Sequence, residues 1–330
     1  MDWKGRRVLV TGASGFIGSH LTELLINKGA RVQALIHYNS FNTWGHLEHY
    51  AKKTPSNLSI IAGDIRDPHF VSSTVNGHEI IFHLAALISI PFSYIAPQLF
   101  IDTNVTGTLH ILEAARRAGV STIIQTSTSE VYGTAQYVPI DEKHPLQGQS
   151  PYSASKIASD QLALSFHRSF NVPVIIVRPF NTFGPHQSAR AIIPTILCQL
   201  LAGATSLSLG DRRPVRDFTY VEDTVRGFLA AAEHGTYGST INIGSGQGYS
   251  VQNVVEKCAT VLQIPKPKIK KDSQRLRPVK SEVWKLICDN RLAHRNLKWS
   301  TKISFEEGLE RTATYIRSNM QFFKEKKYNT

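Results

Sequence analysis

Val8-Leu9-Val10-Thr11-Gly12-Ala13-Ser14-Gly15-Phe16-Ile17-Gly18 stands close to the start of the chain and decides its fold. The short apolar run predicts a buried strand, and the residues from Gly15 to Lys28 carry apolar side chains at helical spacing. The glycines suit a tight turn, a close approach of a ligand to backbone N–H groups, and close packing of helix on strand. The stretch therefore predicts a site for a dinucleotide pyrophosphate, the alternative being a turn with only a structural role. We assign to this site Gly12, Ser14, Gly15, Phe16, Ile17 and Gly18.

Strand and helix signals alternate through the first half of the chain. Strands are expected at 7–10, 32–36, 58–62, 79–84, 122–126 and 174–177, and helices at 15–28, 104–118 and 153–171. This order is typical of a parallel sheet that helices cover on both faces. We expect a Rossmann-type, doubly wound α/β fold with a dinucleotide-binding domain at 1–180.

Beyond residue 180 the alternation loosens and turn signals multiply. Residues 181–330 are expected to form a smaller, mixed α/β substrate domain, interleaved with a last piece of the sheet. A final helix is expected from Phe305, with Ser304 as its cap and Glu307 completing a capping-box pattern.

Composition narrows the class of protein. The chain has 330 residues and a net charge of +12, and none of its apolar runs approaches the ~18 residues that a membrane span needs. The N-terminal pattern is that of a first strand rather than a signal peptide, so we expect a cytoplasmic protein without a membrane partner. Three cysteines without a CxxC motif, and histidines without a ligand spacing, predict neither disulfides nor a metal.

A basic stretch runs from Lys266 to Lys280. Three interpretations are open: a solvated surface, a site for a diphosphate-bearing ligand, and a nucleic-acid site. No aromatic residue is interleaved with these cations, which disfavours nucleic acid.

The end of the second strand bears on the choice between NAD and NADP. NAD-binding proteins usually place an acid there to hold the ribose 2′-hydroxyl, but this chain has His37-Tyr38-Asn39-Ser40. His37, Asn39 and Ser40 could hydrogen-bond a 2′-phosphate, so the sequence favours NADP over NAD. Asp64, after the third strand, is expected to contact the adenine.

Tyr152 and Lys156 are four residues apart and would share one face of a helix. A free phenol has a pKa near ~10, and a neighbouring ammonium and the positive nicotinamide ring should lower it. Such a phenol could accept a hydroxyl proton while the carbon gives hydride to the cofactor, and Lys156 could also hold ribose hydroxyls. In isolation the pair would be interpreted as two surface residues, but its place after a dinucleotide turn favours catalysis.

Thr128, Ser129 and Glu130 follow the fifth strand, at the carboxyl edge of the sheet where ligands bind. Thr128 could hydrogen-bond the reacting hydroxyl. Simple alcohol oxidation needs no additional carboxylate, whereas removing a proton from the carbon beside a new ketone does. Glu130 is therefore predicted to be catalytic, the alternative being a capping or surface residue.

The chain resembles the extended short-chain dehydrogenase/reductase family that acts on nucleotide sugars. The resemblance runs from Arg7 to about residue 315, and its marks are the glycine turn, 63–67, 83–86, 126–133, Tyr152-x₃-Lys156, 178–185 and 216–223. It implies further cofactor contacts from Ile65, Leu84, Ala85, Ala86, Asn104, Thr126 and Arg178. It also implies contacts to the sugar or diphosphate from Asn181, Arg190, Arg216 and Arg277, since a guanidinium matches phosphate oxygens.

Glu130 and its neighbours indicate the subfamily. Epimerases of this family usually have small residues at this position, and 4,6-dehydratases have Glu, preceded by Ser in the GDP-mannose type, as here. UDP-glucuronate decarboxylases share Ser-Thr-Ser-Glu-Val-Tyr-Gly (127–133), so Glu130 does not separate these two. Segments 38–45 and 135–140 resemble dehydratases of legionaminic-acid-type pathways, which act on UDP- or GDP-linked N-acetylglucosamine. A decarboxylase, and less so a 4-epimerase or a non-catalytic dinucleotide sensor, remain alternatives.

The resemblance also implies a mechanism and an assembly. Tyr152 would take the C4 hydroxyl proton, and Glu130, with Ser129, would remove the C5 proton and help the C6 hydroxyl leave as water. The cofactor would end as it began and stay tightly bound. A homodimer would pair the helix of Tyr152 with helix 104–118, with Ala158, Leu162, Ala163 and Phe166 fitting either such a face or an ordinary core.

Overall fold

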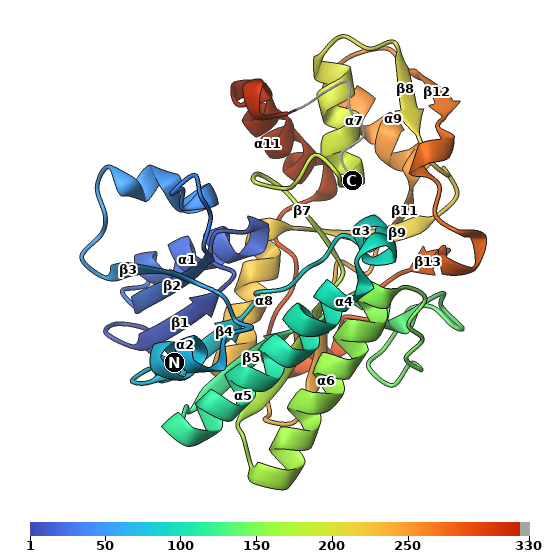
Figure 1. The fold of residues 1–330 in the computed structure, drawn as a ribbon. Coiled ribbons are helices and arrows are strands. Elements are labelled where there is room, and N and C mark those ends of the chain that lie inside the picture. The colour runs from blue at the N-terminus through green and yellow to red at the C-terminus, as the bar shows by residue number, and fades with distance from the viewer. Residues whose placement is uncertain (324–330) are drawn as a thin grey trace.

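A seven-stranded sheet organises the computed structural model, which describes residues 1–323 (Figure 1). Its order is β10-β6-β5-β4-β1-β2-β3, and all of its pairs are parallel. The strands are β1 (Arg7–Thr11), β2 (Arg31–His37), β3 (Leu58–Gly63), β4 (Ile80–His83), β5 (Thr122–Thr126), β6 (Val174–Pro179) and β10 (Thr240–Ile243). The predicted doubly wound α/β fold is confirmed, with the six expected strands in place.

Helices cover both faces of this sheet because alternate strand residues point to opposite sides. Val8 and Val10 belong to the core under α1 (Phe16–Asn27) and α8 (Val221–His234), whereas Leu9 belongs to the core on the other face. That second face is covered by α2 (Pro68–Val75), α5 (Gly107–Ala118) and α6 (Pro151–Phe170). The glycine turn and the catalytic pair are thus held by elements packed on a common sheet.

A second group of elements stands above the carboxyl edge of this sheet (Figure 1). In it, β9 (Val215–Tyr220) pairs with β7 (Asn181–Phe183), β11 (Gly248–Ser250) and β13 (Lys285–Leu286), while β8 (Ser206–Leu209) pairs with β12 (Lys268–Lys271). Its longer helices are α7 (Ile192–Leu201), α9 (Val251–Val261) and α11 (Phe305–Ser318).

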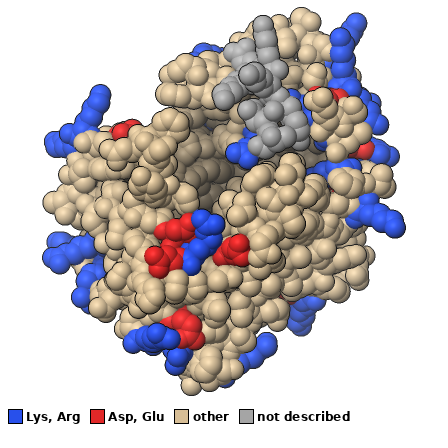
Figure 2. Space-filling model, viewed as in Figure 1, with Lys and Arg blue, Asp and Glu red and all other residues tan. Residues whose placement is uncertain are grey.

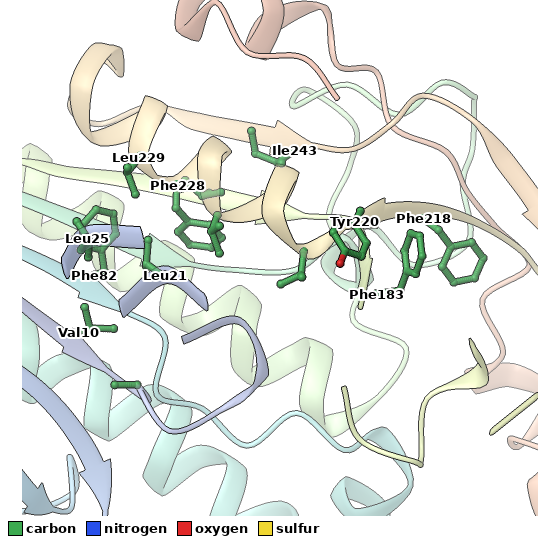
Figure 3. Close-up of a cluster of buried hydrophobic side chains, with 14 of the residues drawn as sticks. Val10, Leu21, Leu25, Phe82, Phe183, Phe218, Tyr220, Phe228, Leu229 and Ile243 are labelled. Atoms are coloured by element: carbon green, nitrogen blue, oxygen red, sulfur yellow. The ribbon is translucent and has the colours of Figure 1, made fainter. Parts of the chain in front are cut away.

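The two groups share one core. Figure 3 follows it from Val10 and Leu21 through Phe228 to Phe183 and Phe218. The chain also returns to the first sheet, since α8 packs on it and β10 pairs with β6. The sheet therefore draws its last strand from beyond residue 180, as the sequence led us to expect.

Details of two predicted helices differ from expectation. The helix expected from residue 104 is preceded by a π-helical turn, η2 (Ile101–Thr106), that runs directly into α5. On α6, Ala163 and Phe166 are buried in the core of the same chain, whereas Ala158 and Leu162 are only half-buried. The first two therefore form an ordinary core face. Ser304 caps α11 as predicted, because its hydroxyl accepts the Glu307 N–H, whereas the Glu307 carboxylate, expected to complete a capping box, accepts from Arg311.

Among residues 1–323 no helix is long and apolar enough to cross a membrane. The same residues contain no group of three or more side chains arranged to hold a metal ion.

Candidate active site

The glycine turn joins β1 to α1 and leaves the helix N-terminus open. Gly12 has φ +70°, and a Cβ there would meet the Ala85 backbone N at 2.8 Å. A Cβ on Gly18 would meet the Gly12 carbonyl oxygen at 2.2 Å, so both positions need glycine for packing. Gly15 is exposed and caps α1 without a side-chain hydrogen bond, which leaves N–H groups of the first turn available to an anion.

The residues predicted to contact the ribose 2′ group and the adenine lie at the ends of β2 and β3. His37 and Ser40 are exposed, and the Asn39 amide donates to the Thr43 carbonyl and so closes its own loop. The His37 Nε2 atom lies 3.6 Å from the Asp64 carboxylate. Arg66, which the sequence reasoning missed, donates from its guanidinium and its backbone N–H to the same carboxylate and holds the pKa of Asp64 below its usual value.

The segment after β4 is fixed from both sides. The Thr11 hydroxyl accepts the N–H groups of Leu84 and Ala85. Asn104, buried in η2, accepts the Leu87 N–H and donates to the Ser155 hydroxyl on α6. Thr11 and Asn104 thereby hold this segment between the glycine turn and the catalytic helix, with Ala86 half-buried between them.

Two other predicted cofactor residues have side chains directed into the protein. Ile65 is buried against Gly107 of α5, so a ligand would meet only its backbone. Arg178 is 3% exposed, and its guanidinium donates to the Asp160 carboxylate and the Tyr132 hydroxyl. The contacts of Arg178 describe a buried ion pair.

Tyr152 and Lys156 lie together on α6, which begins with a capping box formed by Ser150 and Ser153. Both side chains are buried, and the Lys156 ammonium donates to the Thr126 carbonyl at 2.6 Å. The Thr126 hydroxyl is buried without a hydrogen-bond partner, which is a free polar group beside the lysine. The helical spacing predicted for the pair is therefore present.

The predicted lowering of the phenol pKa is wrong for the free protein. Burial raises the pKa of Tyr152, and the charges of Glu130 and Asp160 act in the same direction, whereas a hydrogen bond with Thr128 opposes them. Burial also lowers the pKa of Lys156 to about 8, against the effect of Asp160. Desolvation disfavours the charged form of each group, and it outweighs the attraction that their spacing suggested.

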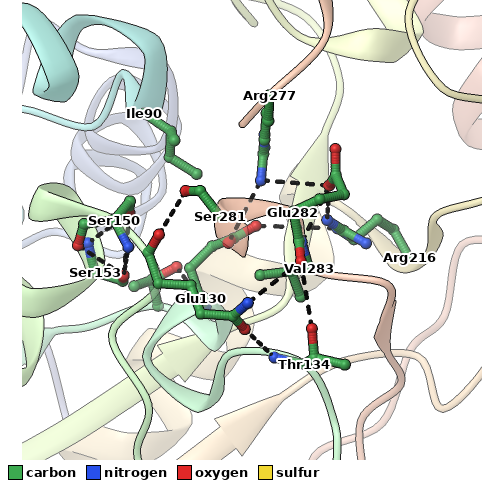
Figure 4. A network of polar contacts seen from close by, with 12 residues as sticks. Ile90, Glu130, Thr134, Ser150, Ser153, Arg216, Arg277, Ser281, Glu282 and Val283 are labelled. Atoms are coloured by element: carbon green, nitrogen blue, oxygen red, sulfur yellow. Dashed lines mark hydrogen bonds and ion pairs between the residues drawn. The ribbon is translucent and has the colours of Figure 1, made fainter. Parts of the chain in front are cut away.

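Glu130 is one of four charged residues whose ion pairs form a ring, which we call the charge ring (Figure 4). It lies on the short helix η3 (Ser129–Tyr132), which Thr128 caps by accepting the Glu130 N–H. Its carboxylate is 3.9 Å from Arg216 Nε and 3.8 Å from Arg277 Nη1. Glu282, which the sequence reasoning missed, closes the ring at 3.6 Å from Arg216 and 3.8 Å from Arg277.

Arg277 Nη1 in this ring is buried without a hydrogen-bond partner, and so is Asn181 Oδ1 on β7, the strand that pairs with β9 of Arg216. Such unsatisfied groups are costly unless a ligand completes them. Arg190, by contrast, is exposed in the loop before α7, where its backbone N–H donates to the Ser188 hydroxyl. Of the four predicted substrate residues, three lie on paired strands or just before one: Asn181 on β7, Arg216 on β9 and Arg277 in the segment before β13. The fourth, Arg190, lies in the loop before α7.

Most other cations of the basic stretch lie on the surface, and Arg275 is half-buried against Asp272. Lys268, Lys270 and Lys271 of β12 are exposed, and Lys266 pairs with Glu256. Figure 2 shows a hollow between the two groups of elements, with lysines and arginines gathered mainly around the outline of the molecule. Arg277 is the member of the stretch that reaches the charge ring.

The fold and the arrangement of glycine turn, Tyr152, Lys156 and Glu130 define an extended short-chain dehydrogenase/reductase, an enzyme of the nucleotide-sugar dehydratase/epimerase type. The chain belongs to the GDP-mannose 4,6-dehydratase family, whose model matches residues 9–312.

Named relatives agree with this membership. The chain is 30% identical to a dTDP-glucose 4,6-dehydratase of Actinoplanes sp. over 96% of its length and 99% of the relative. It is 30% identical to a UDP-glucose 4-epimerase of Mycolicibacterium smegmatis, covering 96% of this chain and 100% of that one. Among solved structures, dTDP-glucose 4,6-dehydratase DesIV from Streptomyces venezuelae, which has NAD bound, superposes with a TM-score of 0.87. It is 31% identical, over 96% of this chain and 99% of its own.

Proposed function

We propose that the protein is a 4,6-dehydratase that converts UDP- or GDP-N-acetylglucosamine to the 4-keto-6-deoxy sugar nucleotide. The observation that carries this proposal is the position of Glu130. Its charge acts on the Tyr152 phenol, and two guanidiniums lie within 4 Å of its carboxylate. A carboxylate between the catalytic phenol and a diphosphate-binding pair suits proton removal from C5 and loss of the C6 hydroxyl.

The residues present fit a dinucleotide. The open turn at Gly15 and the unpartnered Thr126 hydroxyl offer it polar groups at opposite ends of the site. A bound, oxidised nicotinamide would supply hydride chemistry, accepting a hydride from C4 and returning it to C6. We propose NADP over NAD because no acid follows β2 and because Arg66 occupies the Asp64 carboxylate, although DesIV has NAD bound.

In this proposal Tyr152 accepts the proton of the C4 hydroxyl. The free phenol resists ionisation because it is buried, so its hydrogen bond with Thr128 and the nearby Lys156 must favour the phenolate. Lys156 keeps its proton at pH 7, because its pKa of about 8 lies above that value. Glu130 then takes the C5 proton, and Ser129, buried beside it, helps the C6 hydroxyl to leave as water.

Arg216 and Arg277 are proposed to bind the diphosphate, with Asn181 beside them. The support is chemical: Arg277 Nη1 is a buried donor that makes no hydrogen bond, because its two carboxylate neighbours are 3.8 Å away, and a phosphate oxygen could accept from it. We also propose a cytoplasmic homodimer that pairs α5 and α6, on the basis of the resemblance, to be tested by sedimentation.

The test is to incubate the purified protein separately with UDP-N-acetylglucosamine, GDP-N-acetylglucosamine and UDP-glucuronate, and to weigh the products. Loss of one water from an acetylated sugar supports the dehydratase and identifies its nucleotide. Loss of carbon dioxide from the glucuronate would instead support a decarboxylase, for which Arg216 and Arg277 beside Glu130 offer cations that could face a C6 carboxylate. No mass change with all three would refute both substrate assignments and would leave a 4-epimerase or a different nucleotide-sugar substrate.

A further inference from the structure

Three histidine rings form a stack that the proposed mechanism does not use. His186, in the loop after β7, lies in the middle. The ring of His46 is parallel to it, with centroids 4.4 Å apart and an interplanar angle of 1°. His20 of α1 packs on His186 at 4.7 Å and 27°. We call His20, His46 and His186 the histidine clasp.

The clasp joins the glycine turn to two other segments. His46 belongs to the short helix η1 (Gly45–Ala51, light blue in Figure 1), and its N–H donates to the Ser14 carbonyl of the turn. A Cβ on Gly45 would lie 3.0 Å from the Ser14 side chain, so η1 rests directly on the turn. The His186 Nδ1 atom is 3.0 Å from the Ser19 hydroxyl of α1.

The backbone at His186 supports a specific role for this ring. Its φ of +70° places a residue with a side chain in the left-handed region. Such a conformation is unfavourable for a residue with a side chain and persists only where the surroundings enforce it. Here the stack, the Ser19 contact and the approach of His20 Nε2 to the Pro185 carbonyl, at 3.1 Å, hold the loop in place.

We propose that the histidine clasp holds η1 closed over the glycine turn, retains the dinucleotide there between turnovers, and opens when its rings take up protons. His20, His46 and His186 are in this sense positioning residues for the cofactor. The inference rests on the dinucleotide site of the proposed function, but not on the dehydration.

The surrounding charges leave protonated rings without compensation. Glu23 of α1 pairs with His49, Glu48 of η1 accepts hydrogen bonds from Thr43 and Trp44, and Tyr315 of α11 presents an uncharged ring to His186. Arg190, four residues after His186, is exposed. Arg311, four residues before Tyr315 on α11, pairs with Glu222 and Glu307. Within the described residues, no carboxylate is ion-paired with the three clasp rings.

The direction of the pH effect follows from these contacts. Burial lowers the pKa of His46, and burial together with His46, His20 and His49 lowers the pKa of His186 to about 3. The closed clasp therefore binds protons more weakly than an open one, whose histidines have a pKa near ~6.5. The clasp keeps its full stability above that pH and loses stability as the pH falls below it. For His186 the loss is about tenfold for each pH unit between ~6.5 and its pKa of about 3, and His46 acts in the same direction.

The test is the release rate of reduced dinucleotide from the loaded protein, followed by its fluorescence after dilution and without nucleotide sugar. We expect release at pH ~5.5, one unit below the ordinary histidine pKa, to be roughly 10- to 100-fold faster than at pH ~8. His46→Phe keeps a ring in the stack but takes up no proton, so its acceleration should be smaller than that of wild type. His46→Ala, which loses the stacking, should release faster than wild type at pH ~8.

His69→Gln is the matched control, because His69 is an exposed histidine on α2 and should behave as wild type. Thermal melts at both pH values separate opening of the clasp from general unfolding. The inference is overturned if wild-type release does not depend on pH, or if His46→Phe shows the full wild-type dependence. Since no sugar is present, that result would leave the dehydratase proposal to the product-mass test.

Discussion

Glu130→Gln is the substitution that tests the proposed chemistry most directly. The amide keeps the size of the side chain but loses the charge that faces Arg216 and Arg277. It also loses the ability to accept the C5 proton. We therefore expect the first half of the reaction, oxidation at C4, to proceed, and the elimination to stop.

The magnitude follows from the surroundings of the carboxylate. A positioned acid or base contributes about 10²–10⁴-fold to a rate, so turnover to the 4-keto-6-deoxy product should fall by that factor. The effect on binding has the opposite sign. The side chain is only 12% exposed, and two guanidiniums lose an acidic neighbour, which leaves them freer for the diphosphate. At up to about 1 kcal/mol for each of the two ion pairs, substrate affinity should rise by up to roughly 30-fold.

The assay is a rapid-mixing experiment that records reduced nicotinamide by absorbance and product by mass. Reduced cofactor should accumulate in Glu130→Gln and stay transient in wild type. Glu310→Gln, which changes an exposed glutamate on α11, should leave both signals unchanged. Wild-type product formation by Glu130→Gln, or a loss of product without reduced cofactor, would refute the role given to Glu130.

Three further predictions concern the buried charges. Tyr152→Phe should bind dinucleotide as wild type does but lose turnover by about 10²–10⁴-fold, since the proton acceptor is gone; equal turnover would favour a non-catalytic sensor. The kcat/KM should fall as the pH rises through about 8, because burial lowers the pKa of Lys156 to that value and the neutral amine no longer supports the phenolate; a flat pH profile to about pH 10, near the unperturbed lysine pKa, would contradict this. Asp160→Asn should lower the free energy of unfolding by about 3–5 kcal/mol, since it leaves the buried Arg178 without its counter-ion, and urea denaturation measures that change.

The sequence predicted the fold well because its signals were local. An apolar strand, a glycine turn and a helix with regular apolar spacing determine the first unit, and later strands repeat the same pattern. The short elements η1 and η3 were not predicted as helices, and of η2 only residues 104–106 fell within a predicted helix. Their conformations depend on partners far away in the chain, such as Asn104 bonded to Leu87 and Ser155.

The site was predicted in part for a similar reason. Tyr152, Lys156 and Glu130 come together because they follow strands of one sheet. Arg277 was predicted at the site from the family resemblance, and not from its spacing to these residues. Glu282 was missed, although it is one of two acids in the segment 266–285 and could have been suspected as the partner of a nearby cation. The histidine clasp left no comparable signal, because residues 20, 46 and 186 meet only in the folded chain.

The wrong sign for the Tyr152 pKa shows what spacing alone omits. Four residues of helix bring an ammonium near a phenol, but they say nothing about the water that both groups lose. Asp160, one further turn along α6, is the residue that addresses this loss: it raises the pKa of Lys156 against burial, and Arg178 compensates its own charge. A carboxylate four residues after the lysine, such as Asp160, is therefore the sequence signal for a lysine that stays charged inside the protein. In Asp160→Asn the pKa of Lys156 should fall further, so the decline of kcat/KM on the alkaline side should begin at a lower pH than in wild type.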